Sequence, residues 1–181
     1  MKTVKVHQFG SMDMKTSEAG KTYAHHYAKQ IQDDISGKIL KTSTYVPKKK
    51  EVLDALEYYS EVEFQVPPKV SAVKVKGKRA YKRFKANEDF RIEARNINIY
   101  ELSLISHNAA GVYLVQIECG KGGYVRSIAR DCGDFLGCFG CVKSLSRVEY
   151  GPFKIEEAMN LSDLLDQSAS DLGLCIKPIE V

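Results

Sequence analysis

The sequence predicts an α+β fold, with a mixed, mainly antiparallel sheet and helices packed against it. Stretches in which apolar and polar residues alternate outnumber stretches with helical spacing. Most neighbouring strand-like stretches are separated by short loops, as in hairpins, rather than by crossover helices. The length of 181 residues corresponds to about one domain, at roughly 100–200 residues per domain.

The first third of the chain begins with weak signals and ends with a clear helix. Residues 1–20 are polar and without a period, which predicts a poorly defined N-terminal segment. Weak alternation predicts strands over 21–27 and 38–45, separated by a polar turn. Pro47 then opens a predicted helix over 48–60, where apolar residues recur every three or four positions.

The next stretch predicts short strands around a small helix. Alternation over 62–66 stops at Pro67-Pro68, which fixes an extended backbone. A short strand at 70–75, a turn at Gly77-Lys78 and a helix at 80–86 are predicted after it. Together these elements resemble an insertion that projects from the sheet.

The strongest patterns lie in the second half. Residues 97–105 and 112–119 alternate and predict a hairpin. Apolar residues at helical spacing predict a helix over 125–136, for which Gly137 supplies a stop.

The end of the chain predicts a last strand over 141–148 and a polar, partly helical stretch over 154–165. These elements predict one domain over 21–165, with an insertion at 67–86, followed by a C-terminal tail over 166–181.

Positive charge is concentrated in this insertion. Residues 69–85 include eight basic residues and no acidic one, whereas the rest of the chain has 19 basic against 23 acidic residues. Such an asymmetry points to a polyanionic partner such as nucleic acid. A charge run taken alone is also explained by a solvated, lysine-rich loop.

The composition is typical of an ordinary globular protein, with 44% hydrophobic and 28% charged residues. No apolar run approaches the roughly 18 residues of a membrane span, and residues 1–13 lack the apolar core of a signal peptide. We therefore expect a cytoplasmic protein without membrane contact. Five cysteines, an odd number, fit reduced thiols better than a disulfide framework.

The histidines and cysteines do not form the paired ligands of a metal site. Cys138 and Cys141 have CxxC spacing but no second pair, so structural thiols are favoured over metal or redox chemistry. The glycines at 120–123 have the wrong spacing for a nucleotide loop, although they would let a phosphate approach a helix start. We expect no metal and no nucleotide cofactor.

A set of ordered motifs extends over most of the chain: Gln65-Val-Pro-Pro68, Ser71–Tyr81, Arg95, Cys119–Asp131 with Gly123-Tyr-Val-Arg126 inside it, and Gly151-Pro-Phe153. Over roughly 21–165 these motifs resemble the TruB family of bacterial tRNA pseudouridine-55 synthases. The resemblance implies a pseudouridine synthase-like catalytic domain that uses no cofactor and no metal. Such an enzyme flips out the uridine at position 55 of the tRNA T-loop, detaches its base and rejoins it to the ribose through carbon.

The resemblance also implies roles for individual residues. Tyr23 matches the tyrosine that stacks on the flipped base, and Arg126 matches the arginine that pairs with the catalytic aspartate. Leu145 matches a leucine of the substrate pocket, although Ser146 replaces the arginine expected after it. The insertion would grip the T-arm of tRNA, and its candidate RNA-binding residues are Lys74, Lys76, Lys78, Arg79, Tyr81, Lys82 and Arg83.

The sequence departs from the family at the nucleophile. The family motif Gly-His-x-Gly-Thr-Leu-Asp-Pro has no clean copy, and Asp13, eight residues before Lys21, is a weak match for its aspartate. Asp13 as nucleophile therefore stands beside a nucleophile that is missing or supplied separately. The chain is also expected to be truncated at both ends, which would expose sheet edges and favour lower stability or self-association.

Two functions remain open. The first is a tRNA pseudouridine synthase, an isomerase acting on the T-loop uridine. The alternative is a catalytically inactive tRNA-binding or remodelling protein, or a fragment, that lacks the nucleophilic aspartate. Both predict salt-sensitive tRNA binding, and only the first predicts turnover.

Overall fold

The protein is described by a computed structural model over residues 27–30 and 39–165. Every sheet in that part of the chain is a two-stranded antiparallel pair. The pairs are β1 (Tyr27–Gln30) with β2 (Ile39–Ser43), β3 (Phe64–Gln65) with β6 (Arg95–Asn96), β4 (Lys74–Val75) with β5 (Lys78–Arg79), β7 (Ile99–His107) with β8 (Tyr113–Cys119), and β9 (Glu149–Tyr150) with β10 (Phe153–Lys154). The helices are α1 (Lys49–Ser60), α2 (Ala80–Lys85), α3 (Val125–Phe135), the 3-10 turn η1 (Ile155–Glu157) and α4 (Leu161–Leu165). The predicted α+β class is confirmed.

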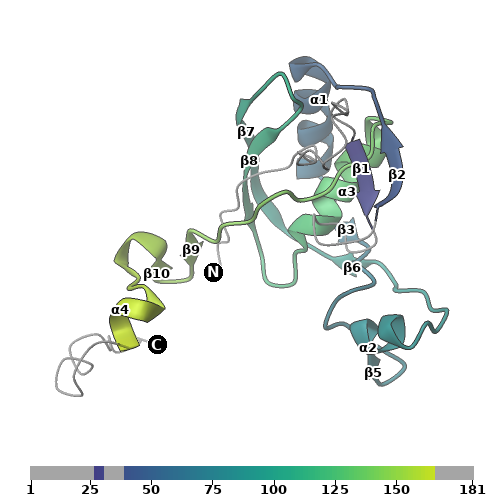
Figure 1. Cartoon of the computed structure of the whole chain (residues 1–181), viewed down its shortest axis with the longest axis vertical. Helices are drawn as coiled ribbons and strands as arrows, with labels where there is room; N and C mark the ends of the chain where they lie inside the picture. The colour runs from purple at the N-terminus through teal and green to yellow at the C-terminus, as the bar shows by residue number, and fades with distance from the viewer. Residues whose placement is uncertain (1–26, 31–38, 166–181) are drawn as a thin grey trace, which may run out of the picture.

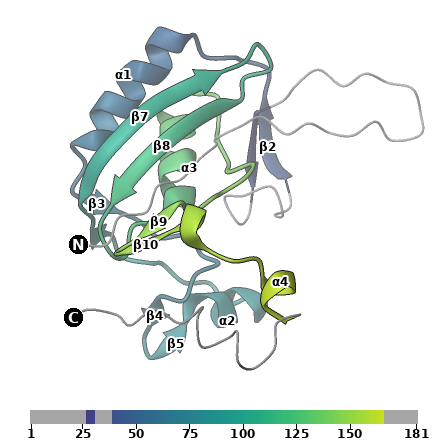
Figure 2. The same cartoon turned by 90° about the vertical axis from the view of Figure 1, so that its left-hand side faces the viewer.

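The core lies between the long β7–β8 hairpin and the helices α1 and α3, which cover the same face of it (Figure 2). Burial alternates along β8, where the side chains of Tyr113, Val115, Ile117 and Cys119 are buried and those between them are half-exposed. The buried residues of α1 and α3 pack against this row, as the helical spacing predicted. The predicted hairpin and both predicted helices are therefore confirmed.

The start of α1 is tied to this core. The Tyr113 hydroxyl of β8 donates a 2.7 Å hydrogen bond to the carbonyl of Pro47. The Glu51 carboxylate accepts hydrogen bonds from the Tyr45 hydroxyl at 2.6 Å and from the Lys48 backbone N–H at 2.7 Å. Because a first-turn carboxylate satisfies an otherwise free N–H group, these contacts fix where the helix begins.

The chain turns back tightly over α3 after the helix ends. Gly137 has a φ of +68°, and the backbone N–H groups of Cys138 and Phe139 donate to the Gly133 carbonyl at 3.0 and 2.9 Å. A Cβ atom on Gly133 would lie 2.1 Å from the backbone nitrogen of Gly140. The helix and the following loop can approach this closely only because residues 133 and 140 are both glycines.

A projection extends from the body between β3 and β6, and we call it the finger, residues 66–94 (Figure 1). It contains the β4–β5 hairpin, with Gly77 at a φ of +79° in the turn, followed by α2. The backbone N–H groups of Ala80 and Tyr81 donate to the carbonyls of Val73 at 2.7 Å and Ser71 at 3.0 Å. The predicted strand, turn and short helix are present, within the finger and beside a second strand that the sequence did not predict.

The strand predicted over 141–148 is wrong. Only Val142 forms an isolated bridge, and residues 144–148 have no strand partner in the described part of the chain. Burial does not alternate there, since Ser144, Leu145 and Arg147 are all exposed. Residue type alone favoured a strand, but pairing decides whether one forms. The partly helical stretch predicted over 154–165 is confirmed by η1 and α4.

Buried thiols and a tyrosine lead us to expect alkaline destabilisation. Burial raises the pKa of the Cys138 thiol from 9.0 to about 11, and burial together with the Asp131 carboxylate raises the pKa of Tyr59 from 10.0 to about 12. A group with a raised pKa in the fold stabilises fully below its unfolded pKa, and this stability is lost as pH rises through the folded pKa. The urea midpoint should therefore fall between about pH 9 and 11. It should fall less in Cys138→Ala, and an equal fall in that variant would contradict the assignment.

Candidate functional site

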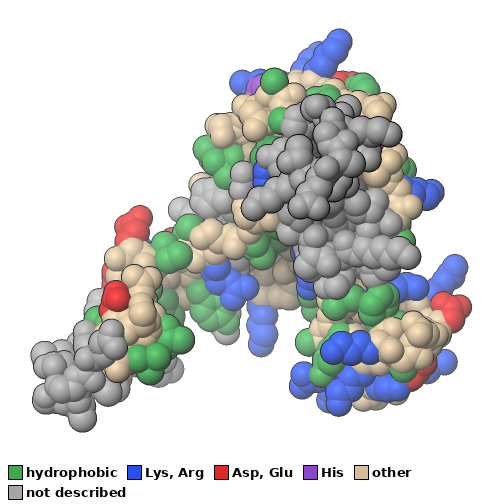
Figure 3. All heavy atoms as spheres, viewed as in Figure 1, with side chains coloured by type: hydrophobic (Ala, Val, Ile, Leu, Met, Phe, Trp, Pro, Cys, Tyr) green, Lys and Arg blue, Asp and Glu red, His purple; other side chains and the backbone are tan. Residues whose placement is uncertain are grey.

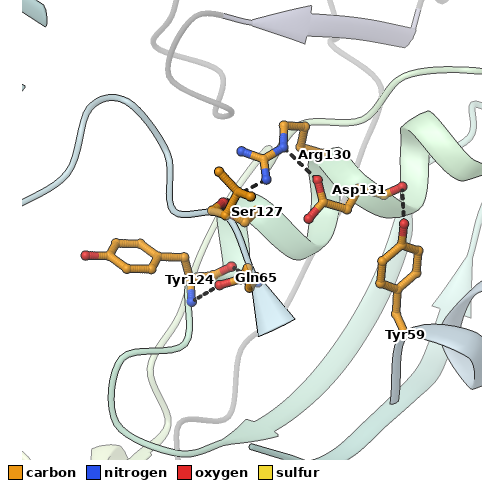
Figure 4. A network of polar contacts seen from close by, with 7 residues as sticks. Tyr59, Gln65, Tyr124, Ser127, Arg130 and Asp131 are labelled. Carbon is orange, nitrogen blue, oxygen red and sulfur yellow. Dashed lines mark hydrogen bonds and ion pairs between the residues drawn. The ribbon is translucent and has the colours of Figure 1, made fainter. Parts of the chain in front are cut away.

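The N-terminus of α3 is fixed to the base of the finger through Gln65 (Figure 4). The side-chain amide of Gln65 donates to the Tyr124 carbonyl at 3.0 Å and accepts from the Tyr124 backbone N–H at 2.8 Å. Gln65 is 7% exposed, so its amide acts as an internal partner for the backbone that precedes the helix. This pair sets the position at which α3 begins relative to the finger.

Two further residues of α3 hold the next residue of the finger (Figure 4). The Ser127 hydroxyl and the Arg130 guanidinium both donate to the Val66 carbonyl, at 2.8 and 2.9 Å. Arg130 also pairs with the Asp131 carboxylate at 2.7 Å, and the Tyr59 hydroxyl of α1 donates to the Asp131 carbonyl at 3.0 Å. The base of the finger, α3 and α1 are therefore joined in one polar network.

Arg126, the predicted catalytic arginine, also faces the finger. Its side chain is half-buried, and its Nη2 donates to the Val70 carbonyl at 3.2 Å. Arg126 and Arg130 lie one turn apart on α3, and both donate to carbonyls of the finger. Beside Arg126, an open pocket of about 470 Å³ separates α3 from α2. We call it the finger pocket; its lining residues are Val70, Ser71, Ala72, Tyr81, Phe84, Lys85 and Arg126.

Several basic side chains gather on the finger, among hydrophobic and a few acidic ones (Figure 3). An acidic residue just beyond the basic run, Glu88, pairs with Lys78 and with Arg83, the latter at 2.6 Å. The Lys78 ammonium and the Arg83 guanidinium hold the pKa of the Glu88 carboxyl below its ordinary value. Part of the predicted positive charge is thus neutralised within the finger. The exposed basic residues of the finger outside this pairing are Lys69, Lys74, Lys76, Arg79, Lys82, Lys85 and Arg91.

The other predicted site residues are placed as follows. Asp13 and Tyr23 lie outside the described residues. Leu145 lies in the extended stretch before β9, with 53% of its side chain exposed. Tyr81, a predicted RNA-binding residue, is half-buried in the wall of the finger pocket. The described part of the chain thus brings Arg126 and Tyr81 together.

Sequence reasoning missed Gln65, Ser127 and Arg130 as the residues that fix the finger to α3. Their signal was indirect. Gln65 lies two positions before a pair of prolines, and Ser127 and Arg130 are polar residues on a strongly amphipathic helix. No spacing in the sequence shows that two segments about 60 residues apart share a carbonyl.

Two family models match the chain and together establish the protein family to which it belongs. The model described as "TruB family pseudouridylate synthase (N terminal domain)" matches residues 4–125, and the "tRNA pseudouridylate synthase B C-terminal domain" model matches residues 126–181. The chain belongs to the TruB family. The boundary between the two TruB matches falls inside α3. In the structure this helix packs in one core with α1 and β8, so the boundary does not separate two folded units.

Individual TruB relatives agree with this membership. The chain is 39% identical over 149 residues to tRNA pseudouridine synthase B of Ruegeria pomeroyi, covering 82% of this chain and 49% of that protein. It is 44% identical over 134 residues to the protein of the same name from Dinoroseobacter shibae, covering 74% and 44%. The chain therefore spans about half the length of the curated relatives it matches.

A solved structure shares the fold. A chain of a Cbf5-Nop10-Gar1 complex superposes with a TM-score of 0.56 at 18% identity, covering 91% of this chain and 35% of that one. This likeness concerns the fold alone, and it agrees with the predicted pseudouridine synthase-like architecture. Within residues 27–30 and 39–165, no helix has the length and apolar character that crossing a membrane requires.

Proposed function

We propose that this chain is a tRNA pseudouridine synthase that isomerises the uridine at position 55 of the T-loop in the cytoplasm. The observation that carries the proposal is the match of residues 4–125 to the TruB N-terminal domain. The relatives that are about 40% identical to the chain over the aligned residues are named tRNA pseudouridine synthase B, which supports the same activity.

The reaction needs few groups from the protein. Its substrate and product have the same atoms, since a bond from the ribose to a base nitrogen is replaced by a bond to a base carbon, and that carbon loses a proton while the released nitrogen gains one. A carboxylate attacks, an aromatic side chain stacks on the flipped base, and a cation stabilises the carboxylate. In this proposal Asp13 is the candidate nucleophile, Tyr23 the stacking residue and Arg126 the cation, while Leu145 packs in the pocket. The position of Arg126 at the base of the finger supports its place beside bound RNA.

Mapping of pseudouridine in a T-arm transcript tests the proposal. The full chain and its Asp13→Ala variant are incubated with the transcript, and the product is located by chemical labelling and primer extension. Product from the parent and none from the variant supports the activity with Asp13 as nucleophile. Product from both means that another carboxylate attacks, and no product from either contradicts the proposed activity.

The alternative, a tRNA-binding protein without catalysis, is favoured by one observation. The sequence has no clean copy of the family's nucleophile motif. This alternative requires tight binding of the T-arm without product. If the parent chain neither binds the T-arm nor forms product, both functions are contradicted.

Opposite charge changes on the finger should shift RNA affinity in opposite directions. Replacing Lys74, Lys76, Arg79 and Lys82 by glutamine removes four exposed charges and should weaken T-arm binding, with a shallower dependence on salt. Glu88→Gln should instead strengthen binding, because Lys78 and Arg83 lose their internal partner and become available to the RNA. The slope of log affinity against log salt should then steepen by the amount expected for about one or two further phosphate contacts. Binding titrations at several salt concentrations measure both. Equal affinity of all three proteins would reject the finger as an RNA-binding surface.

A further inference from the structure

The hydroxyl of Ser71 is buried without a hydrogen-bond partner. Ser71 is 6% exposed, and its Oγ is the only buried side-chain oxygen or nitrogen in the described part of the chain that has no partner there. The backbone at this position is held in place, since the Ser71 carbonyl accepts a 3.0 Å hydrogen bond from the Tyr81 N–H. An unpaired buried hydroxyl destabilises a fold, so its presence calls for a partner that arrives from outside.

Ser71 lies in the wall of the finger pocket. The other side chains of the pocket suit a ligand that has both an anionic group and a ring. Lys85 provides a cationic group that is separate from the one assigned to catalysis, and none of the lining residues is acidic. Tyr81 and Phe84, one turn apart on α2, provide aromatic surface in the same wall. A volume of about 470 Å³ is enough for one nucleotide-sized group.

We propose that the finger pocket binds one ribose–phosphate unit of the RNA, with Ser71 as a hydrogen-bond donor to a phosphate oxygen. Ser71 lines the pocket, and rotation about χ1 between staggered rotamers would be enough to turn its Oγ toward a bound phosphate. Lys85 neutralises the phosphate charge, and the sugar lies against the aromatic wall. This inference rests on the proposed function, because RNA has to be the ligand.

The proposal gives Ser71→Ala an unusual pair of effects. In the free protein the variant removes an unpaired hydroxyl, so its thermal midpoint should equal or exceed that of the parent. In the complex it removes a donor to a charged group, so RNA affinity should fall about tenfold. A purely structural serine would behave in the opposite way.

Ser127→Ala is the matched control. Ser127 is also a buried serine near the base of the finger, but its hydroxyl donates to the Val66 carbonyl at 2.8 Å. This variant should therefore lower the thermal midpoint, as expected for a satisfied internal hydrogen bond.

The experiment titrates the full chain and its variants with a T-arm RNA hairpin by fluorescence anisotropy at several salt concentrations. Ser71→Ala should lower affinity with an unchanged salt slope, because serine is neutral, whereas Lys85→Gln should lower affinity and reduce the slope by about one. If both side chains hold one phosphate, the double variant should lose less affinity than the sum of the single losses.

Each possible result supports or overturns the inference. If the parent binds RNA and Ser71→Ala binds as tightly, the inference fails while the proposed function stands. A Ser71→Ala variant with a lowered thermal midpoint shows a structural role and also overturns the inference. A parent chain that does not bind the hairpin overturns the inference and the proposed function together.

Discussion

Arg126→Gln should lower the rate of pseudouridine formation by about 100- to 5,000-fold, because a charged group left without its partner costs about 3–5 kcal/mol. Glutamine is two bonds shorter than arginine, so the variant also loses the Nη2 contact with the Val70 carbonyl, and a control has to separate the two effects. The positive charge that the proposed nucleophile needs is lost. Single-turnover kinetics on a T-arm transcript, with RNA affinity measured separately, would show the effect in the rate rather than in binding.

Arg130→Gln is the control for this prediction. Arg130 lies one turn further along α3 and also contacts the finger, through the Val66 carbonyl, and it pairs with Asp131. The control thus perturbs the same interface without removing the charge assigned to catalysis. Similar losses of rate in both variants would show that Arg126 acts by holding the finger and not through the reacting groups.

The second large effect is expected from Gly133→Ala, which should destabilise the chain by about 3 kcal/mol or lead to misfolding. The new methyl group would lie 2.1 Å from the Gly140 nitrogen and 2.3 Å from the Phe139 carbonyl carbon, and both are backbone atoms that cannot rotate away. The loop would have to leave the helix, which would open the core around Cys138. Urea denaturation followed by circular dichroism measures the loss.

Gly137→Ala separates this clash from other effects of losing a glycine. Gly137 lies in the same turn at a φ of +68°, and a Cβ atom there would meet nothing within 4 Å. Its substitution should cost about 1–2 kcal/mol through backbone strain alone. A Gly133→Ala variant no less stable than Gly137→Ala would contradict the close approach of the loop to α3.

The parts of the fold that the sequence predicted well are those with long local patterns. The α3 helix and the β7–β8 hairpin each carry a period over seven or more residues, and both were confirmed. The two-residue strands β5 and β6 have no room for a period, so only the folded chain reveals them. The false strand at 141–148 shows the converse, because apolar residues there found no partner strand in the described part of the chain.

The candidate site also has features that the sequence predicted and features that only the structure shows. The motif around Arg126 and the basic run were visible as sequence, since each is a short contiguous signal. The partial neutralisation by Glu88 was not, because this residue follows the run and reaches back to Lys78 across ten positions. The unpaired hydroxyl of Ser71 depends on what surrounds it in three dimensions, so no sequence pattern could have indicated it.

The narrow β3–β6 pairing at the neck of the finger has a consequence for the evolution and redesign of this scaffold. Both ends of residues 66–94 meet at a pairing of two residues, Phe64 with Asn96 and Gln65 with Arg95. Lengthening a segment whose ends are already joined adds little entropic penalty. Finger sequences of different length and charge could thus be exchanged as cassettes between relatives. Substrate range would then change by swapping one contiguous segment while the catalytic framework keeps its shape.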